Sequence, residues 1–111
     1  MNREIRFFEN HFMDFYLQLS PKAQEKVDFV LKLITTVKQV PEKFLKHLSG
    51  TDGLFEIRVE YQSNCFRIFY CFDEGNLVIL LNAFTKKTDK IPRREIDKAD
   101  SLKRTYFSKH R

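Results

Sequence analysis

The sequence has few residues that break or cross-link a chain: three glycines, three prolines, two cysteines and no tryptophan among 111 residues. It also lacks a membrane span, because its longest apolar run, residues 77–84, is far shorter than the roughly 20 residues that a bilayer requires. The N-terminus lacks the apolar stretch of a secretory signal. Internal repeats and low-complexity segments are absent as well. We therefore expect a cytoplasmic protein that does not bind a membrane.

The two cysteines predict neither a disulfide nor a metal site. Cys65 and Cys71 fall in one predicted strand, where about 3.3 Å per residue separates them by about 20 Å. A disulfide requires Cα atoms within about 7 Å of one another. The sequence has no Cys and His spacing typical of zinc and no acidic cluster typical of magnesium. We expect reduced thiols in a reducing compartment, and no metal or other cofactor.

Aromatic and basic residues are abundant. Twelve Phe and four Tyr accompany 32% charged residues, which is typical of a soluble domain with an aromatic core. The formal net charge is +5, and residues 85–111 hold ten Lys and Arg against four Asp and Glu. This C-terminal excess favours nucleic acid or an acidic partner. The length predicts one domain, residues 1–111.

The first half of the chain predicts a short strand and a helical hairpin. Residues 3–8 form the opening strand, and Asn10 is the expected N-cap of a helix of about ten residues. Ser20 followed by Pro21 is a start signal for a second helix. Apolar residues recur at helical spacing in both segments, at Phe12, Phe15, Tyr16 and Leu19 and then at Val27, Val30, Leu31, Ile34 and Val37. We interpret these stripes as core.

Residues 54–85 predict a three-stranded antiparallel meander, which follows a connection at 38–53 with a helical turn near Phe44 to Leu48. If Ser63 and Asn64 form a two-residue turn, Arg67 lies opposite Glu60 and Phe69 lies opposite Arg58. Arg58, Arg67 and Glu56 then share one open face, while Tyr61 and Tyr70 point to the core face. Asp73 to Asn76 form the second turn, and the third strand is apolar on both faces, as in a covered strand.

Ile91 and Pro92 predict the start of a C-terminal helix with an apolar inner stripe. The outward residues include Arg93, Arg94, Lys98 and Arg104. The predicted fold is α+β, in the order β-α-α-β-β-β-α, with an antiparallel sheet, a helical hairpin on one of its faces and a C-terminal helix.

Four short motifs stand in order along the chain: GLFEIRV at 53–59, FRIFY at 66–70, FTKKT at 84–88, and Pro92 with Glu95 and Ile96. In this arrangement the chain resembles the RelE/ParE superfamily of bacterial toxins, specifically its HigB-like, phage-derived branch, over nearly its whole length. The resemblance implies a RelE-like fold and a type II toxin held inactive by a cognate antitoxin, usually a helix-turn-helix, HigA-like protein. It also implies a ribosome-dependent mRNA endoribonuclease that cleaves mRNA in the ribosomal A site without a metal.

RNA cleavage without a metal needs a proton acceptor, cations that stabilise the charge on the phosphorane, and a proton donor for the leaving oxygen. Arg58 and Arg67 suit the second role, because a guanidinium can hold two phosphate oxygens. Glu56, Glu42 and His47 are candidate bases, with Glu42 lying where some relatives supply an acidic residue. The candidate catalytic residues are Arg58, Arg67, Lys87, Glu56 and Glu42, and the candidate RNA-binding residues are Lys86, His47, Lys46, Arg93, Arg94 and Tyr106.

The candidate residues also have structural interpretations. Arg58 and Arg67 could pair with Glu60 and Glu56 across the hairpin. Many HigB-like sequences have His where this chain has Asn82, and Tyr106 is left as the tyrosine of the closing helix for stacking on a base. Two further functions therefore remain open: a ParE-like inhibitor of DNA gyrase, and a non-catalytic, phage-derived binding protein of the same fold.

Overall fold

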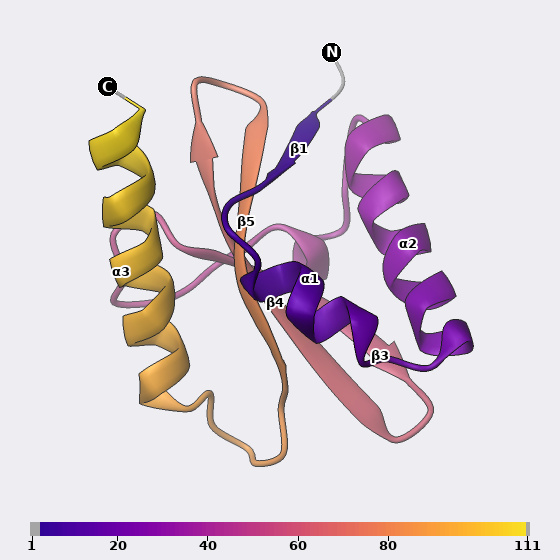
Figure 1. Cartoon of the computed structure of the whole chain (residues 1–111). Helices are drawn as coiled ribbons and strands as arrows, with labels where there is room; N and C mark the ends of the chain where they lie inside the picture. Colours follow the sequence, from indigo (N-terminus) through magenta and orange to yellow (C-terminus); the bar gives the residue numbers. More distant parts are fainter. Residues whose placement is uncertain (1–2, 111) are drawn as a thin grey trace.

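The computed structural model describes residues 3–110 and has the predicted α+β class. One five-stranded sheet, in the order β1-β5-β4-β3-β2, has helices α1 and α2 on one face and α3 on the other (Figure 1). The elements are β1 (Glu4–Phe7), α1 (His11–Leu17), α2 (Pro21–Thr36), the 3-10 helix η1 (Glu42–Phe44), β2 (Lys46–His47), β3 (Phe55–Tyr61), β4 (Asn64–Asp73), β5 (Leu77–Thr85) and α3 (Arg93–Lys109). None of the helices in this described range is long and apolar enough to cross a membrane.

The β3–β4 hairpin confirms the predicted faces but corrects the predicted turn. Tyr61 lies opposite Asn64, so the turn residues are Gln62 and Ser63, and Arg58 lies directly opposite Arg67. The prediction was wrong by one residue because no glycine marks the position with positive φ, which Gln62 takes at 54°. Moving the turn by one residue shifts the register by two, an even number. Both arginines therefore keep the same face.

The sheet contains two strands, β1 and β2, in addition to the predicted meander. β1 runs parallel to β5, with Glu4 beside Leu77 and Phe7 beside Leu80, so the sheet is mixed. The predicted helical turn at Phe44 to Leu48 is wrong in position. Pro41 starts the 3-10 turn, since its carbonyl accepts from the backbone N–H of Phe44 at 2.9 Å, and the chain then extends into β2.

The face of the sheet under α1 and α2 holds the larger core cluster. Val27, Val30 and Ile34 of α2 are buried against Ile57 and Ile68, as the helical spacing predicts. The N-terminus of α2 is capped by its predicted residue, because Ser20 Oγ accepts from the N–H of Ala23 at 3.2 Å. Asn10 precedes α1 as expected but makes no side-chain capping bond.

The opposite face is not open as predicted, because α3 covers much of it. Phe69 and Cys71 pack with Ala99 and Leu102 in a second buried cluster. β5 adapts to this packing through a bulge: Ile68 pairs with Ala83 and Tyr70 with Leu80, so residues 81 and 82 together oppose Phe69. The charged residues of this face, Glu56, Arg58 and Arg67, lie outside the α3 cluster.

Candidate functional site

Two arginines share one buried carboxylate on strands β3 and β4. The Nε of Arg58 donates to Glu56 Oε1 at 2.7 Å, and the Nε of Arg67 lies 3.6 Å from the same oxygen. The side chains of Glu56, Arg67 and Arg58 are 1%, 6% and 36% exposed. The hydrogen bond that Arg58 donates to Glu56 raises the pKa of Arg58. We name Glu56, Arg58 and Arg67 the arginine cluster; it carries a net charge of +1 and presents Arg58 at the surface.

The arginine cluster corrects the pairing expected across the hairpin. Both arginines pair with Glu56, whereas Glu60 is exposed. Glu56 is almost completely enclosed, and one of its oxygens is occupied by the arginines. This geometry suits a residue that positions the guanidinium groups better than one that takes a proton from a substrate.

The arginine cluster also contains buried polar atoms that make no hydrogen bond within the described residues. Glu56 Oε2 and Arg67 Nε are buried and make no hydrogen bond within residues 3–110. Such atoms are uncommon in native interiors and are often found at functional sites. Arg67 Nη1 instead donates to the thiol of Cys65, which sequence reasoning treated only as a structural thiol. The side-chain alternation along β4 could have found it, because residues 65 and 67 share a face.

The segment before β3 places one candidate residue, Lys46, on the face of the arginine cluster and another, His47, on the opposite face. Lys46 lies opposite Glu56 across β2 and β3, so it shares the face of the arginines. His47 lies opposite Phe55, with its ring 5.3 Å from the Phe55 ring, and therefore points to the other face. Glu42 is exposed at the start of η1.

The two lysines after β5 differ in their backbone register. The N–H of Lys86 donates to the carbonyl of Cys65 at 2.8 Å, which extends the β4–β5 ladder by one position. Since Phe84 lies opposite Arg67, alternation places Lys86 on the face of Arg67. Lys87 is exposed and lines a cleft beside α1. The geometry thus favours Lys86 over the predicted Lys87 as the lysine nearer to the arginine cluster.

Tyr106 is a core residue, which contradicts its predicted contact with RNA. Its side chain is 2% exposed, its hydroxyl donates to Asp73 Oδ2 at 2.7 Å, and its ring stacks on His110 with centroids 4.2 Å apart. Burial, followed by the bond to Asp73, raises its pKa. The predicted contact is wrong because α3 directs this residue against the sheet.

Asn82 occupies the position at which the resemblance to HigB-like sequences implies an imidazole. It is buried in the bulge of β5, and its Nδ2 donates to the carbonyl of Glu95 at 3.2 Å and to Glu95 Oε1 at 3.1 Å. Asn82 therefore ties β5 to the first turn of α3. A polar residue inside an apolar run was the signal for this role in the sequence.

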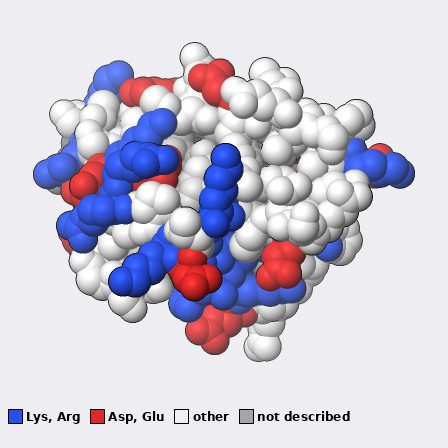
Figure 2. All heavy atoms as spheres, turned by 90° about the horizontal axis from the view of Figure 1, so that it is seen from below, with Lys and Arg blue, Asp and Glu red and all other residues white. Residues whose placement is uncertain are grey.

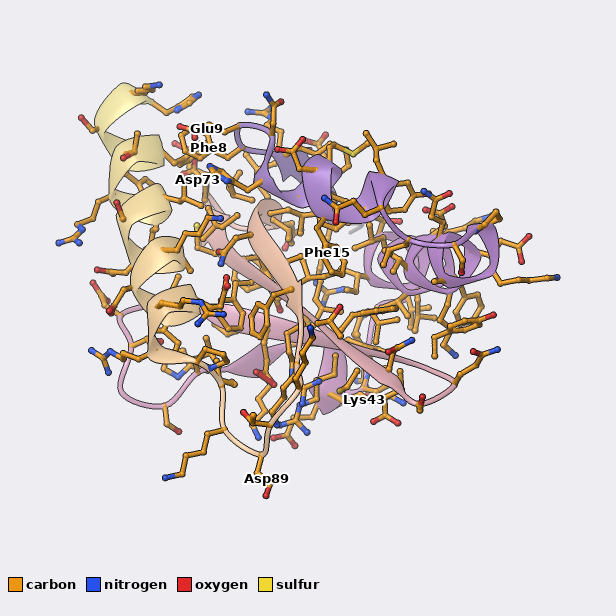
Figure 3. All side chains as sticks on the ribbon, turned by 60° about the horizontal axis from the view of Figure 1, so that its bottom comes forward. Phe8, Glu9, Phe15, Lys43, Asp73 and Asp89 are labelled. Carbon is orange, nitrogen blue, oxygen red and sulfur yellow. The ribbon has the colours of Figure 1, made fainter. Side chains whose placement is uncertain are left out.

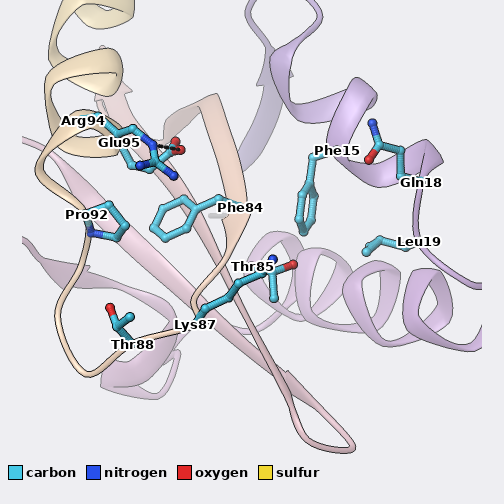
Figure 4. Close-up of a pocket in the computed structure, with 10 residues that line it drawn as sticks. All are labelled: Phe15, Gln18, Leu19, Phe84, Thr85, Lys87, Thr88, Pro92, Arg94 and Glu95. Carbon is cyan, nitrogen blue, oxygen red and sulfur yellow. Dashed lines mark ion pairs between the residues drawn. The ribbon is translucent and has the colours of Figure 1, made fainter.

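A cleft of about 570 Å³ opens between α1 and the start of α3, and sequence reasoning did not find it because distant segments form it. Figure 4 shows Phe15 of α1 and Phe84 of β5 on its walls, with Arg94 beside Glu95 at its rim. Arg94 and Arg93 are both exposed; Arg94 Nε lies 3.9 Å from Glu95 Oε2, and Arg93 Nε lies 3.1 Å from Asp97. Further lining residues are Gln18, Leu19, Thr85, Lys87, Thr88 and Pro92.

The cleft lies at the basic end of the molecule. The loop between β5 and α3 projects there, with Asp89 at its tip (Figure 3). Seen from this end, Lys and Arg side chains gather over one half of the surface, while the other half is largely uncharged (Figure 2). The exposed basic residues of this stretch are Lys87, Lys90, Arg93 and Arg94. Within residues 3–110, no group of three or more His, Cys, Asp and Glu side chains is placed to hold a metal ion.

The element order and the helix-flanked α+β sheet are those of a RelE-like fold, the class to which the RelE/ParE-like toxins belong. Within that superfamily, the chain belongs to the family described as phage-derived protein Gp49-like (DUF891), whose sequence profile matches residues 14–104. Comparison with curated proteins finds no match. The family confirms the predicted resemblance at the level of the superfamily.

Proposed function

We propose that residues 1–111 form a single HigB-like toxin domain of a type II toxin-antitoxin pair, and that it cleaves mRNA on the ribosome without a metal. The observation that carries this proposal is the arginine cluster. Two guanidinium groups on adjacent strands are held against one buried carboxylate, and the more exposed of them, Arg58, reaches the surface. Membership of the Gp49-like family supports the assignment to toxins.

The proposed reaction is attack of a ribose 2′-oxygen on the adjacent phosphorus. The bond from phosphorus to the 5′-oxygen breaks, which leaves a 2′,3′-cyclic phosphate and a 5′-oxygen that takes a proton from solvent water to become a hydroxyl. Arg58 binds the non-bridging oxygens, where negative charge grows in the transition state, and Arg67 adds a second positive charge from beneath it. Strand positions and the shared carboxylate keep both groups in place before substrate arrives.

Other residues complete the proposed site. Lys46 and Lys86 share the face of the arginines and supply further positive charge to the flanking phosphates. Glu42, an exposed carboxylate on η1, is the proposed acceptor of the 2′-hydroxyl proton. The proposed partners are the ribosome with its mRNA and a helix-turn-helix, HigA-like antitoxin.

The test is expression of the toxin in bacteria with Arg58→Gln or Arg67→Gln, each compared with Arg104→Gln. Arg104 is exposed on α3, so the control removes one positive charge far along the sequence from the cluster. Losing one donor to a developing oxyanion lowers rates by about 100-fold. We expect growth arrest and new mRNA ends within translated codons from the control, and about 100-fold less cleavage from the Arg58 variant.

Folding must be checked in the same experiment, because Arg67 is buried. Thermal unfolding of the purified variants separates loss of structure from loss of activity. If the Arg58 variant folds normally and still arrests growth with the same mRNA ends, the arginine cluster is not the catalytic site.

A second candidate function is supported by the positions of Asn82 and Tyr106. Asn82 stands where an imidazole is common in relatives and is engaged with α3, and Tyr106 is buried. Both observations favour inhibition of DNA gyrase, or partner binding without catalysis. A supercoiling assay with purified gyrase identifies the first of these, and harmless expression without any antitoxin identifies the second.

A further inference from the structure

The cleft between α1 and α3 adjoins the arginine cluster through one residue. Phe84 lies on a wall of the cleft and pairs across the strands with Arg67. Residues directly opposite one another in an antiparallel pair have Cβ atoms about 5 Å apart. A molecule that occupies the cleft therefore lies within one nucleotide's length of the arginine side chains.

The floor of the cleft includes an open edge of the sheet. β1 pairs with β5 only as far as Leu80, and within residues 3–110 no other strand continues along that edge. The N–H of Lys86 points to β4, where it donates to Cys65. Backbone groups alternate in direction along a strand, so those of Thr85, which lines the cleft, point away from β4 toward it. Thr85 offers one backbone donor and one backbone acceptor there.

The remaining lining indicates the chemistry of a ligand. Phe15, Phe84 and Pro92 offer flat apolar surfaces, while Lys87 and Arg94 place positive charge at the rim. The one carboxylate among the lining residues is Glu95, which accepts from Asn82 and lies beside Arg94. An aromatic ring system with hydrogen-bonding edges and flanking anionic groups satisfies all three features. The volume of about 570 Å³ is in the range of small-ligand sites.

We propose that this cleft holds one nucleobase of single-stranded RNA, stacked on its aromatic wall and hydrogen-bonded by the open edge of β5 at Thr85. The proposal rests on the proposed function and adds to it a base-binding subsite beside the arginine cluster. A protein strand is the less suitable occupant, because Thr85 alone offers one backbone donor and one backbone acceptor, which is too short a ladder for a strand. Lys87 and Arg94 bind the phosphates on either side of the base.

The test uses a short 2′-O-methyl oligoribonucleotide, which lacks the attacking hydroxyl and so cannot be cleaved. NMR titration of the full chain should shift the backbone amide of Thr85. Replacing one nucleotide at a time by an abasic residue keeps the phosphates but removes the base. Since stacking of a base on an aromatic side chain contributes about tenfold or more to affinity, one abasic position should weaken binding by about tenfold.

Two matched variants separate this cleft from general charge effects. Gln18→Glu places a negative charge in the cleft lining, and Gln39→Glu makes the same change at an exposed residue that does not line it. We expect the first to weaken binding of the oligonucleotide about fivefold more than the second. Equal binding by both variants, or an amide of Thr85 that does not respond, overturns the proposal and leaves the edge to a protein strand.

The outcome is distinguishable from failure of the proposed function. If Arg58→Gln abolishes mRNA cleavage but every abasic oligonucleotide binds as tightly as the intact one, the nuclease stands and the base subsite is wrong. If the amide of Thr85 responds to the oligonucleotide while arrested cells contain no new mRNA ends, the subsite stands and the nuclease assignment is wrong.

Discussion

At the scale of single residues, Glu56 determines whether two like charges can face each other in a sheet. Arg58 and Arg67 are direct cross-strand partners, an arrangement that is unfavourable without a counter-charge. Glu56 supplies that charge from inside the protein, where it is nearly inaccessible to water. The two arginines therefore need the Glu56 carboxylate as their counter-charge, and the buried carboxylate needs the arginines as its partners.

Replacing Glu56 by Gln removes the counter-charge while keeping the size of the side chain. Breaking a buried ion pair by neutralising one partner costs about 3 kcal/mol or more, because the other charge remains buried. We expect the free energy of unfolding, measured in urea at neutral pH, to fall by about 3 kcal/mol.

The matched control is Glu60→Gln, four residues along the same strand. Glu60 is exposed, so its neutralisation should change the free energy of unfolding by less than about 0.5 kcal/mol. Equal effects of the two substitutions would show that Glu56 does not hold the arginines together.

The sequence predicted the shared face of the arginines but not their surroundings. Side-chain alternation in a strand is unaffected by a register shift of two residues. The arginines therefore share the predicted face although the predicted turn was wrong by one residue. The burial of Tyr106 depends on how α3 packs on the sheet, which no local pattern encodes.

At the scale of elements, the β3–β4 turn and the β5–α3 contact each contain one residue with a particular structural role. Gln62 adopts a φ of 54°, a left-handed conformation that costs a residue with a Cβ atom about 1 kcal/mol. Asn82 makes two hydrogen bonds to Glu95 in the first turn of α3. The first residue stores strain and the second joins a helix to the sheet.

Replacing Gln62 by Gly should stabilise the protein by about 0.5 kcal/mol, since relief of the left-handed strain exceeds the entropy that glycine loses on folding. The midpoint of thermal unfolding measures this change. Ser63→Gly is the control, because Ser63 has no positive φ, and it should be neutral or destabilising. Stabilisation by both or by neither would mean that the positive φ of Gln62 carries no strain.

Replacing Asn82 by Ala should loosen α3 from the sheet. Two hydrogen bonds are lost and the Glu95 carbonyl loses its side-chain donor, so we expect a loss of about 2 kcal/mol. Hydrogen exchange should speed up in the first turns of α3 more than in α2, which Asn82 does not bond. Uniform acceleration in both helices would indicate global destabilisation without a specific role in docking α3.

At the scale of the whole molecule, both faces of the sheet are covered, and several ionisable groups are enclosed as neutral species. Burial raises the pKa of Cys71 from its ordinary 9.0 to about 11, and burial also raises the pKa of Tyr70. The pKa of Tyr106 is raised as well. Because α3 covers Cys71 and Tyr106, the stability of the folded protein depends on these two side chains remaining protonated.

The expected consequence is a loss of stability in alkali. A group whose pKa is raised on folding stabilises the protein fully below its unfolded pKa, and this stabilisation disappears as pH rises through the folded pKa. For Cys71 the window is pH 9.0 to about 11, and a shift of two units corresponds to about 3 kcal/mol. The free energy of unfolding should decline across this window.

Cys71→Ala tests the assignment through the slope of stability against pH. The variant should be less stable at neutral pH, because it creates a small cavity, but its stability should fall less steeply between pH 9.0 and about 11. A slope identical to that of the unsubstituted protein would assign the alkaline loss to other groups.

The bulge in β5 determines which side chains of this strand lie on the face of the arginine cluster. Before it, Leu80 pairs with Tyr70; without the extra residue the same count would place Ala83 opposite Arg67 and Phe84 opposite Phe66. The bulge advances the pairing by one position, so Phe84 meets Arg67 and Lys86 follows on the same face. One inserted residue therefore determines which of two alternating sets of β5 side chains lies on the face of the arginines. Because of it, an aromatic ring and a lysine lie beside the arginines in place of an alanine and a threonine.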